Sequence, residues 1–151
     1  MERALERDGT YNACAALLDR TVARGFAEKA AFIDRRRSLT YRELQDDSRR
    51  FANLLHRIGV RREQRVALLL LDTVEFPIAF LGAIRAGIVP VPLNTLLTAE
   101  QYAYILRDAR ARALVVSAPL LPVIEPVLSR LADLERVIVV GGEAGPHVDF
   151  A

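Results

Sequence analysis

The sequence is poor in the residues that build thiol and metal sites. Its 151 residues include one cysteine, Cys14, and two histidines, His56 and His147. A single thiol cannot form an internal disulfide, and two histidines do not complete a three-histidine metal centre. This composition excludes a disulfide-stapled scaffold and a zinc cluster held by several thiols. It also agrees with a reducing cytoplasm, which is the location we predict.

Lysine and long apolar stretches are scarce as well. Lys29 is the only lysine among 21 basic residues, so 20 of them are arginine. The formal net charge of +2 is too small to indicate a nucleic-acid or membrane partner. Apolar runs such as residues 66–71 are far shorter than the ~20 residues of a membrane-spanning helix. We therefore expect a soluble protein that binds neither nucleic acid nor membrane.

The chain does have the composition of an ordinary globular domain. Hydrophobic residues make up 52% of it and charged residues 26%, which argues against disorder. A length of 151 residues fits one domain with one contiguous core. Two arginine clusters, residues 35–37 and 61–62, fall where turns are expected. Charge runs of this kind are usually solvated surface, so we predict exposed loops there.

Apolar residues at helical spacing alternate with short apolar runs along most of the chain. Two Thr-x-x-Glu/Gln capping boxes, beginning at Thr40 and Thr98, mark helix starts. Gly25, Gly59 and Gly87 mark helix ends. The pattern predicts helices over residues 13–24, 40–58, 75–86, 98–109 and 120–131, and strands over 30–34, 39–41, 65–71, 89–93, 113–117 and 137–140.

The order of these elements predicts the fold class. The first two strands read as a hairpin, and the later strands alternate with helices, as in βαβ units with right-handed crossovers. Residues 65–71 (RVALLLL) form a continuous apolar run typical of a strand buried on both faces. Prolines in residues 89–93 (VPVPL) place that strand near an edge. The prediction is an α/β fold with a mostly parallel sheet and flanking helices.

Ligands of open α/β sheets bind at the carboxyl ends of the strands. The candidate residues at those ends are Asp72, Thr73, Asn94, Thr95, Ser117, Gly141 and Gly142. For Asp72 and Thr73 we favour a helix-capping role, with Pro77 in the first turn, and for Asn94 and Thr95 a turn.

The glycine-rich segment 141–145 follows a strand, as a phosphate loop does, but no helix is predicted after it. We favour a surface turn for this segment. The sequence also lacks a Gly-x-Ser-x-Gly elbow, a Walker loop and a His-Glu-x-x-His pair. His56 lies beside an apolar stripe with no nucleophile or metal partner, which indicates a surface histidine. The residues alone therefore indicate an α/β segment without a recognisable active centre.

Two segments carry a resemblance to a known family. Residues 39–44 (LTYREL) resemble the first signature of the acyl-adenylate-forming superfamily, and residues 80–94 (FLGAIRAGIVPVPLN) resemble its second. Further stretches look like those of benzoate–CoA ligases in particular: residues 11–13, 17–20, 71–77, 94–98 and 102–110. The similarity runs from about residue 11 to residue 117, which is most of the chain.

The resemblance implies the fold of the AMP-binding superfamily and a two-step ligase reaction. An aryl acid such as benzoate would react with ATP, with Mg²⁺ present, to give acyl-AMP and pyrophosphate. The CoA thiol would then displace AMP. ATP, Mg²⁺ and CoA are therefore the expected cofactors of the full-length enzyme, and the aryl acid its expected substrate.

The family's reactive motifs do not occur in these residues. The Ser/Thr/Gly-rich loop ending in Pro-Lys, the Thr-Glu pair, the ribose-binding Asp and the C-terminal lysine have no counterpart, and Lys29 lacks a glycine-rich context. We therefore assign no catalytic, cofactor-binding or metal-binding residue, and expect no cofactor for this segment alone. The expectation is that residues 1–151 are an incomplete N-terminal part of the large AMP-binding domain, without the small C-terminal domain and inactive alone.

Two alternatives stay open at this point. One is an adenylating ligase for another carboxylic acid, because the family forms its acyl pocket mainly from later residues. The other is a noncatalytic, truncated paralogue that acts as a binding module.

Overall fold

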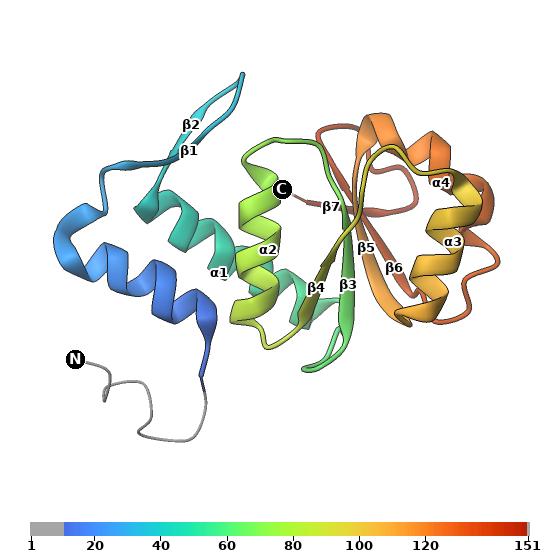
Figure 1. Ribbon diagram of the computed structural model, residues 1–151, viewed down its shortest axis with the longest axis horizontal. Coiled ribbons are helices and arrows are strands. Elements are labelled where there is room, and N and C mark those ends of the chain that lie inside the picture. The colour runs from blue at the N-terminus through green and yellow to red at the C-terminus, as the bar shows by residue number, and fades with distance from the viewer. Residues whose placement is uncertain (1–10, 151) are drawn as a thin grey trace.

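The computed structural model of the chain describes residues 11–150. A helical N-terminal segment and a β-hairpin precede a five-stranded sheet with helices on both sides (Figure 1). No helix in the described part of the chain is long and apolar enough to cross a membrane. The α-helices are α1 (Tyr41–Arg57), α2 (Glu75–Arg85), α3 (Ala99–Asp108) and α4 (Leu121–Leu128). The strands are β1 (Ala30–Ile33), β2 (Ser38–Thr40), β3 (Arg65–Leu69), β4 (Val89–Pro92), β5 (Ala111–Ser117), β6 (Arg136–Val140) and β7 (Val148–Asp149).

The large sheet is parallel throughout, in the order β4-β3-β5-β6-β7. This confirms the predicted α/β class, and it confirms that the proline-containing strand β4 lies at an edge. The predicted strand pair near the N-terminus is also confirmed, since β1 and β2 form an antiparallel hairpin.

The helices divide between the two faces of the sheet, α1 and α2 on one side and α3 and α4 on the other (Figure 1). Strand β3 shows how the sequence achieves this, because successive side chains of a strand point to opposite faces. Val66 and Leu68 pack with α1 and α2, whereas Ala67 and Leu69 pack with α3 and α4. The continuous apolar run therefore serves two hydrophobic cores at once, as a parallel strand covered on both faces requires.

Helix boundaries follow the local signals closely. In both predicted capping boxes the threonine side chain accepts a hydrogen bond from the third helical backbone N–H. The side-chain oxygen of that third residue, Glu43 or Gln101, accepts a hydrogen bond from the threonine backbone N–H. Gly59 follows α1 with φ of +90°, a left-handed conformation that glycine adopts without steric cost. These predictions are confirmed because they depend only on residues a few positions apart.

The N-terminal helix is present but differs in winding from an α-helix. Residues 15–19 and 22–26 form π-helical turns, and the Arg20 N–H donates to the Ala15 carbonyl five residues earlier. Gly25 has φ of +89°, so the regular helix breaks where the sequence predicted. Over so short a segment, apolar spacing does not distinguish an α-helix from a π-helix.

The larger differences from the prediction concern β3, the last helix and β7. Strand β3 ends at Leu69, not at residue 71, because the Leu71 N–H donates to the Ser117 side chain. The last predicted helix is shorter, with a 3₁₀ turn (Ala118–Leu120) before α4, which ends at Leu128. Strand β7 was not predicted, since two residues are too few to show a period.

Candidate functional site

The carboxyl edge of the sheet is where the sequence placed its candidate residues, and the parallel strands do bring them to one edge. Ser117 is buried at the end of β5, and its Oγ accepts a hydrogen bond from the Leu71 N–H at 3.0 Å. This bond ties the end of β5 to the chain leaving β3. The candidate residue Ser117 therefore has a structural partner within the sheet.

The β-hairpin docks on this edge through one carboxylate. Asp34 Oδ1 accepts hydrogen bonds from the backbone N–H groups of Arg36 at 2.7 Å and Arg37 at 2.9 Å. Its Oδ2 accepts from the Val74 N–H at 2.9 Å, at the start of α2. Backbone hydrogen bonds from Arg37, Val74 and Arg36 lower the pKa of the Asp34 carboxyl from its ordinary value. We call this arrangement the Asp34 latch.

The predicted capping of α2 by Asp72 and Thr73 is wrong. No side-chain hydrogen bond caps α2 from its own N-cap residue, Val74, and the orphan N–H of that residue is satisfied by Asp34 instead of Asp72 or Thr73. Asp72 is exposed, and the buried Thr73 hydroxyl has no hydrogen-bond partner among the described residues. Sequence reasoning missed Asp34 because a bond spanning forty positions leaves no local pattern.

The other strand ends behave as predicted. The Asn94 side chain accepts from the Leu96 N–H at 2.9 Å, which forms the expected turn, and the Tyr102 hydroxyl donates to the Asn94 carbonyl at 2.8 Å. The loop after β6 begins at Gly141, with φ of +75°, and leads to β7 instead of a helix. A Cβ placed on Gly142 would lie 2.6 Å from the Ala118 Cβ, so close packing accounts for that glycine. A phosphate loop with a following helix N-terminus is absent here.

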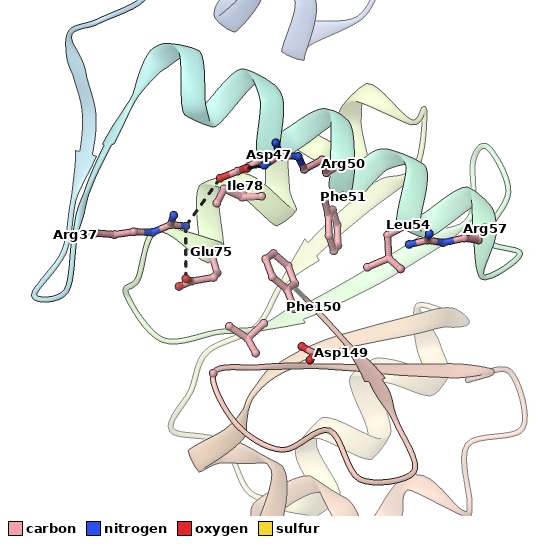
Figure 2. A pocket seen from close by; sticks show the side chains of 12 residues that line it. Arg37, Asp47, Arg50, Phe51, Leu54, Arg57, Glu75, Ile78, Asp149 and Phe150 are labelled. Atoms are coloured by element: carbon pink, nitrogen blue, oxygen red, sulfur yellow. Dashed lines mark hydrogen bonds and ion pairs between the residues drawn. The ribbon is translucent and has the colours of Figure 1, made fainter.

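A cavity of about 510 Å³ adjoins this edge, between α1, α2 and the C-terminal strand (Figure 2). Its apolar wall includes Phe51 and Phe150, whose ring centroids are 5.1 Å apart. Arg37 reaches from the hairpin toward Glu75 at 3.8 Å and Asp47 at 4.0 Å. The arginine cluster 35–37 is exposed in a turn, as predicted, but Arg37 also bridges the hairpin to both helices.

The charges around the cavity are largely matched by other charges of the chain. Asp47 pairs with Arg50 at 2.8 Å in addition to Arg37. No group of three or more His, Cys, Asp or Glu residues that would hold a metal ion occurs in residues 11–150. Lys29 lies over the Phe26 ring at 4.6 Å, and His56 is exposed on α1. Arg37, Arg50 and Arg57 line the cavity, and Arg37 and Arg50 are paired with carboxylates. The described residues offer no set of ligands for an ion such as Mg²⁺.

A second polar cluster lies under the N-terminal helix, away from the carboxyl edge. Arg85, at the end of α2, donates to both carboxylate oxygens of Asp19, at 2.6 and 3.2 Å, and to the Ser48 hydroxyl at 3.3 Å. Gln45 donates to Asp19 at 2.7 Å. Asn12 donates to the carbonyls that end α2, at 2.9 and 3.3 Å. We call these five residues the Arg85 hub, which joins the N-terminal helix, α1 and α2.

Cys14 is fully buried beside the hub. Burial raises the pKa of the Cys14 thiol despite the opposing influence of Arg85. A buried, protonated thiol is a poor nucleophile, so Cys14 serves packing. Within residues 11–150, the hydrogen bonds and ion pairs of the carboxyl edge and of the hub hold the helices and the hairpin in place.

Comparison with known proteins places these features in a family. The sequence profile of the family described as "AMP-binding enzyme" matches residues 19–148. A 4-hydroxybenzoate–CoA/benzoate–CoA ligase of Rhodopseudomonas palustris is 52% identical over 141 residues, which is 93% of this chain and 26% of that protein. A benzoate–CoA ligase of Thauera aromatica is 41% identical over 133 residues, which is 87% of this chain and 25% of that protein. The chain thus spans about a quarter of the length of these curated relatives.

Solved structures give the same result. A benzoate CoA ligase from Burkholderia xenovorans LB400 aligns with a TM-score of 0.85 and 40% identity, covering 93% of this chain and 27% of that one. An anthranilate CoA ligase in complex with anthranoyl-AMP aligns with a TM-score of 0.85 and 36% identity, covering 93% of this chain and 26% of that one. The chain belongs to the AMP-binding enzyme family, the acyl-adenylate-forming family that its two signatures indicate, and benzoate–CoA ligases are among its relatives.

Proposed function

We propose that this chain is the N-terminal part of the large AMP-binding domain of an acid–CoA ligase that acts on benzoate or a related aryl acid. The observation that carries the proposal is the 52% identity to a 4-hydroxybenzoate–CoA/benzoate–CoA ligase across 93% of the chain. Relatives named for benzoate, hydroxybenzoates and anthranilate all point to an aromatic carboxylate as the acid. In aromatic acid degradation such an enzyme would activate the acid as its CoA thioester.

The residues of this segment would contribute scaffold to that enzyme. The Asp34 latch fixes the hairpin on the carboxyl edge, and the Arg85 hub fixes the N-terminal helix on α1 and α2. The complete enzyme would use ATP, Mg²⁺ and CoA, with the groups that contact them supplied by other segments, including a small C-terminal domain. Because the reaction would consume ATP and CoA, we place it in the cytoplasm.

A chimeric ligase tests this proposal. The segment of the Rhodopseudomonas palustris ligase that aligns with this chain would be replaced by the chain itself. We expect the chimera to catalyse benzoate-dependent pyrophosphate exchange and to form benzoyl-CoA. We expect the 151-residue chain alone to show neither pyrophosphate exchange nor benzoyl-CoA formation, because the family motifs that would stabilise a reacting phosphoryl group do not occur in it.

Two controls make the result decisive. The unmodified ligase sets the reference rate, and a panel of benzoate, 4-hydroxybenzoate and a long-chain fatty acid tests which acid the segment supports. A chimera that folds, binds ATP and still shows no exchange with any acid would contradict the proposed function and favour a noncatalytic binding module. Exchange by the 151-residue chain alone would contradict its expected inactivity.

A further inference from the structure

Strand β4 forms one edge of the large sheet, and no strand within residues 11–150 pairs with its outer side. The Val89 N–H donates to the Gln64 carbonyl at 2.9 Å, and the Leu93 N–H donates to the Leu68 carbonyl at 3.0 Å. Backbone groups of successive strand residues point alternately to the two neighbouring sides. The register therefore turns residues 89, 91 and 93 toward β3 and residues 90 and 92 toward the open side.

Both outward positions are proline. Pro90 and Pro92 have no backbone N–H, so each presents only a carbonyl oxygen at the edge. The residue before them in the same register, Ile88, directs its N–H to the Ala83 carbonyl at 2.9 Å. Over residues 88–92, the open side of β4 therefore offers hydrogen-bond acceptors and no available donor.

We propose that Pro90 and Pro92 close the β4 edge to strand pairing with a second copy of this chain. Two such edges brought together would place carbonyl against carbonyl, with no N–H to satisfy either. Unpaired backbone carbonyls shielded from water are unfavourable, so the paired state is disfavoured.

The composition of β4 supports this assignment. An exposed edge strand is a template for aggregation, and proteins block such edges with charges, prolines, bulges or coverage. Strand β4 (VPVP) carries no charge, and Val89 is 43% exposed, so an apolar side chain lies at the open edge. Among the described residues, the prolines are the feature of β4 that can block the edge. This inference does not depend on the proposed ligase function.

The test compares the 151-residue chain with the double variant P90V/P92V, which restores two outward N–H groups without adding charge. The matched control is P119V/P122V, because these prolines are exposed at helix starts and lie outside the sheet. Sedimentation over a concentration series measures self-association, and hydrogen exchange locates it. We expect P90V/P92V to self-associate roughly tenfold or more tightly than the unmodified chain, since each ladder bond adds a small net gain. Exchange protection should rise in residues 88–93.

Three results would overturn the proposal. One is equal self-association of P90V/P92V, the control and the unmodified chain. Another is tighter self-association of P90V/P92V with hydrogen-exchange protection that maps outside residues 88–93. The third concerns the single variant P92V, at the end of β4, which is tested if circular dichroism shows that the double variant does not fold. Unchanged association of folded P92V would equally contradict the proposal.

Discussion

Replacing Arg85 with methionine should destabilise the chain more than any single surface change, because the Arg85 hub joins three helical segments. The Arg85 side chain is 17% exposed, and its guanidinium donates to both oxygens of Asp19, whose side chain is 32% exposed. Removing one partner of a fully buried ion pair costs about 3–5 kcal/mol. Because water reaches a third of Asp19, we reduce the expected cost of R85M to about 2–3 kcal/mol.

Urea unfolding followed by far-UV circular dichroism measures this cost, and the m-value shows whether the transition stays two-state. For a chain of this size, the expected loss corresponds to a fall in Tm of roughly 5–10 °C. A double-mutant cycle with D19N separates the pair from the packing of the arginine stem. If R85M and D19N are additive, or if R85M costs under about 0.5 kcal/mol, the hub is not the stabilising contact described here.

The same pair gives a pH dependence with a defined sign. Burial raises the pKa of Asp19, but hydrogen bonds from Arg85 and Gln45 lower it more, so the folded pKa lies below the ordinary value. A carboxyl with a lowered folded pKa contributes stability above its unfolded pKa of about 3.9 and loses that contribution as pH falls through the folded pKa. The gap in stability between the unmodified chain and R85M should therefore narrow below about pH 4. A gap that widens on acidification would refute this assignment.

Two further changes test the other contacts. D34N removes the charge from the Asp34 latch while keeping its shape, and it should speed hydrogen exchange at the amides of Arg37 and Val74. The pKa of Asp34 is lowered in the folded chain, so the stability that its carboxylate contributes should be lost only as pH falls through that lowered pKa. Exchange at these amides that is unchanged in D34N would contradict the latch. G82A should cost about 1–3 kcal/mol in urea unfolding, because a Cβ would lie 2.8 Å from the Ser48 carbonyl and 2.9 Å from Phe51 Cδ1. A neutral G82A would show that α1 and α2 separate easily.

Local chemistry explains which parts of the fold were predictable from the sequence. The capping boxes at Thr40 and Thr98 act within four residues, so their motif suffices to place a helix start. The proline positions in residues 89–93 were enough to place β4 at an edge. The alternation of strands and helices along the chain predicted the parallel sheet, because a helix between two strands brings the second strand back parallel to the first.

The parts that were missed depend on pairs of residues distant in the sequence. Asp34 looks like an ordinary turn residue until the fold brings it to the Val74 N–H. Arg85 and Asp19 are single charges in a chain with 21 basic and 19 acidic residues, and no pattern selects this pair. A single sequence carries no local pattern for such contacts, because they form only when the chain folds.

The residues of the second signature, 80–94, have structural roles in the fold. Gly82 permits the close approach of α2 to α1, and Arg85 holds the hub. Pro90 and Pro92 face the open edge of the sheet, and Asn94 forms the turn that follows. Each of these residues has a structural partner or a steric reason, and none faces a set of converging catalytic groups within residues 11–150.

This leads to an expectation about how the signature affects activity in the chimeric ligase. If it marks scaffold, substitutions such as R85M should lower benzoyl-CoA formation in proportion to the loss of folded protein. The rate per folded molecule should then stay near that of the parent chimera. An interaction made only in the transition state would instead lower kcat without lowering Tm. Comparing the two quantities for R85M and G82A therefore decides whether these residues support the fold or take part in the reaction.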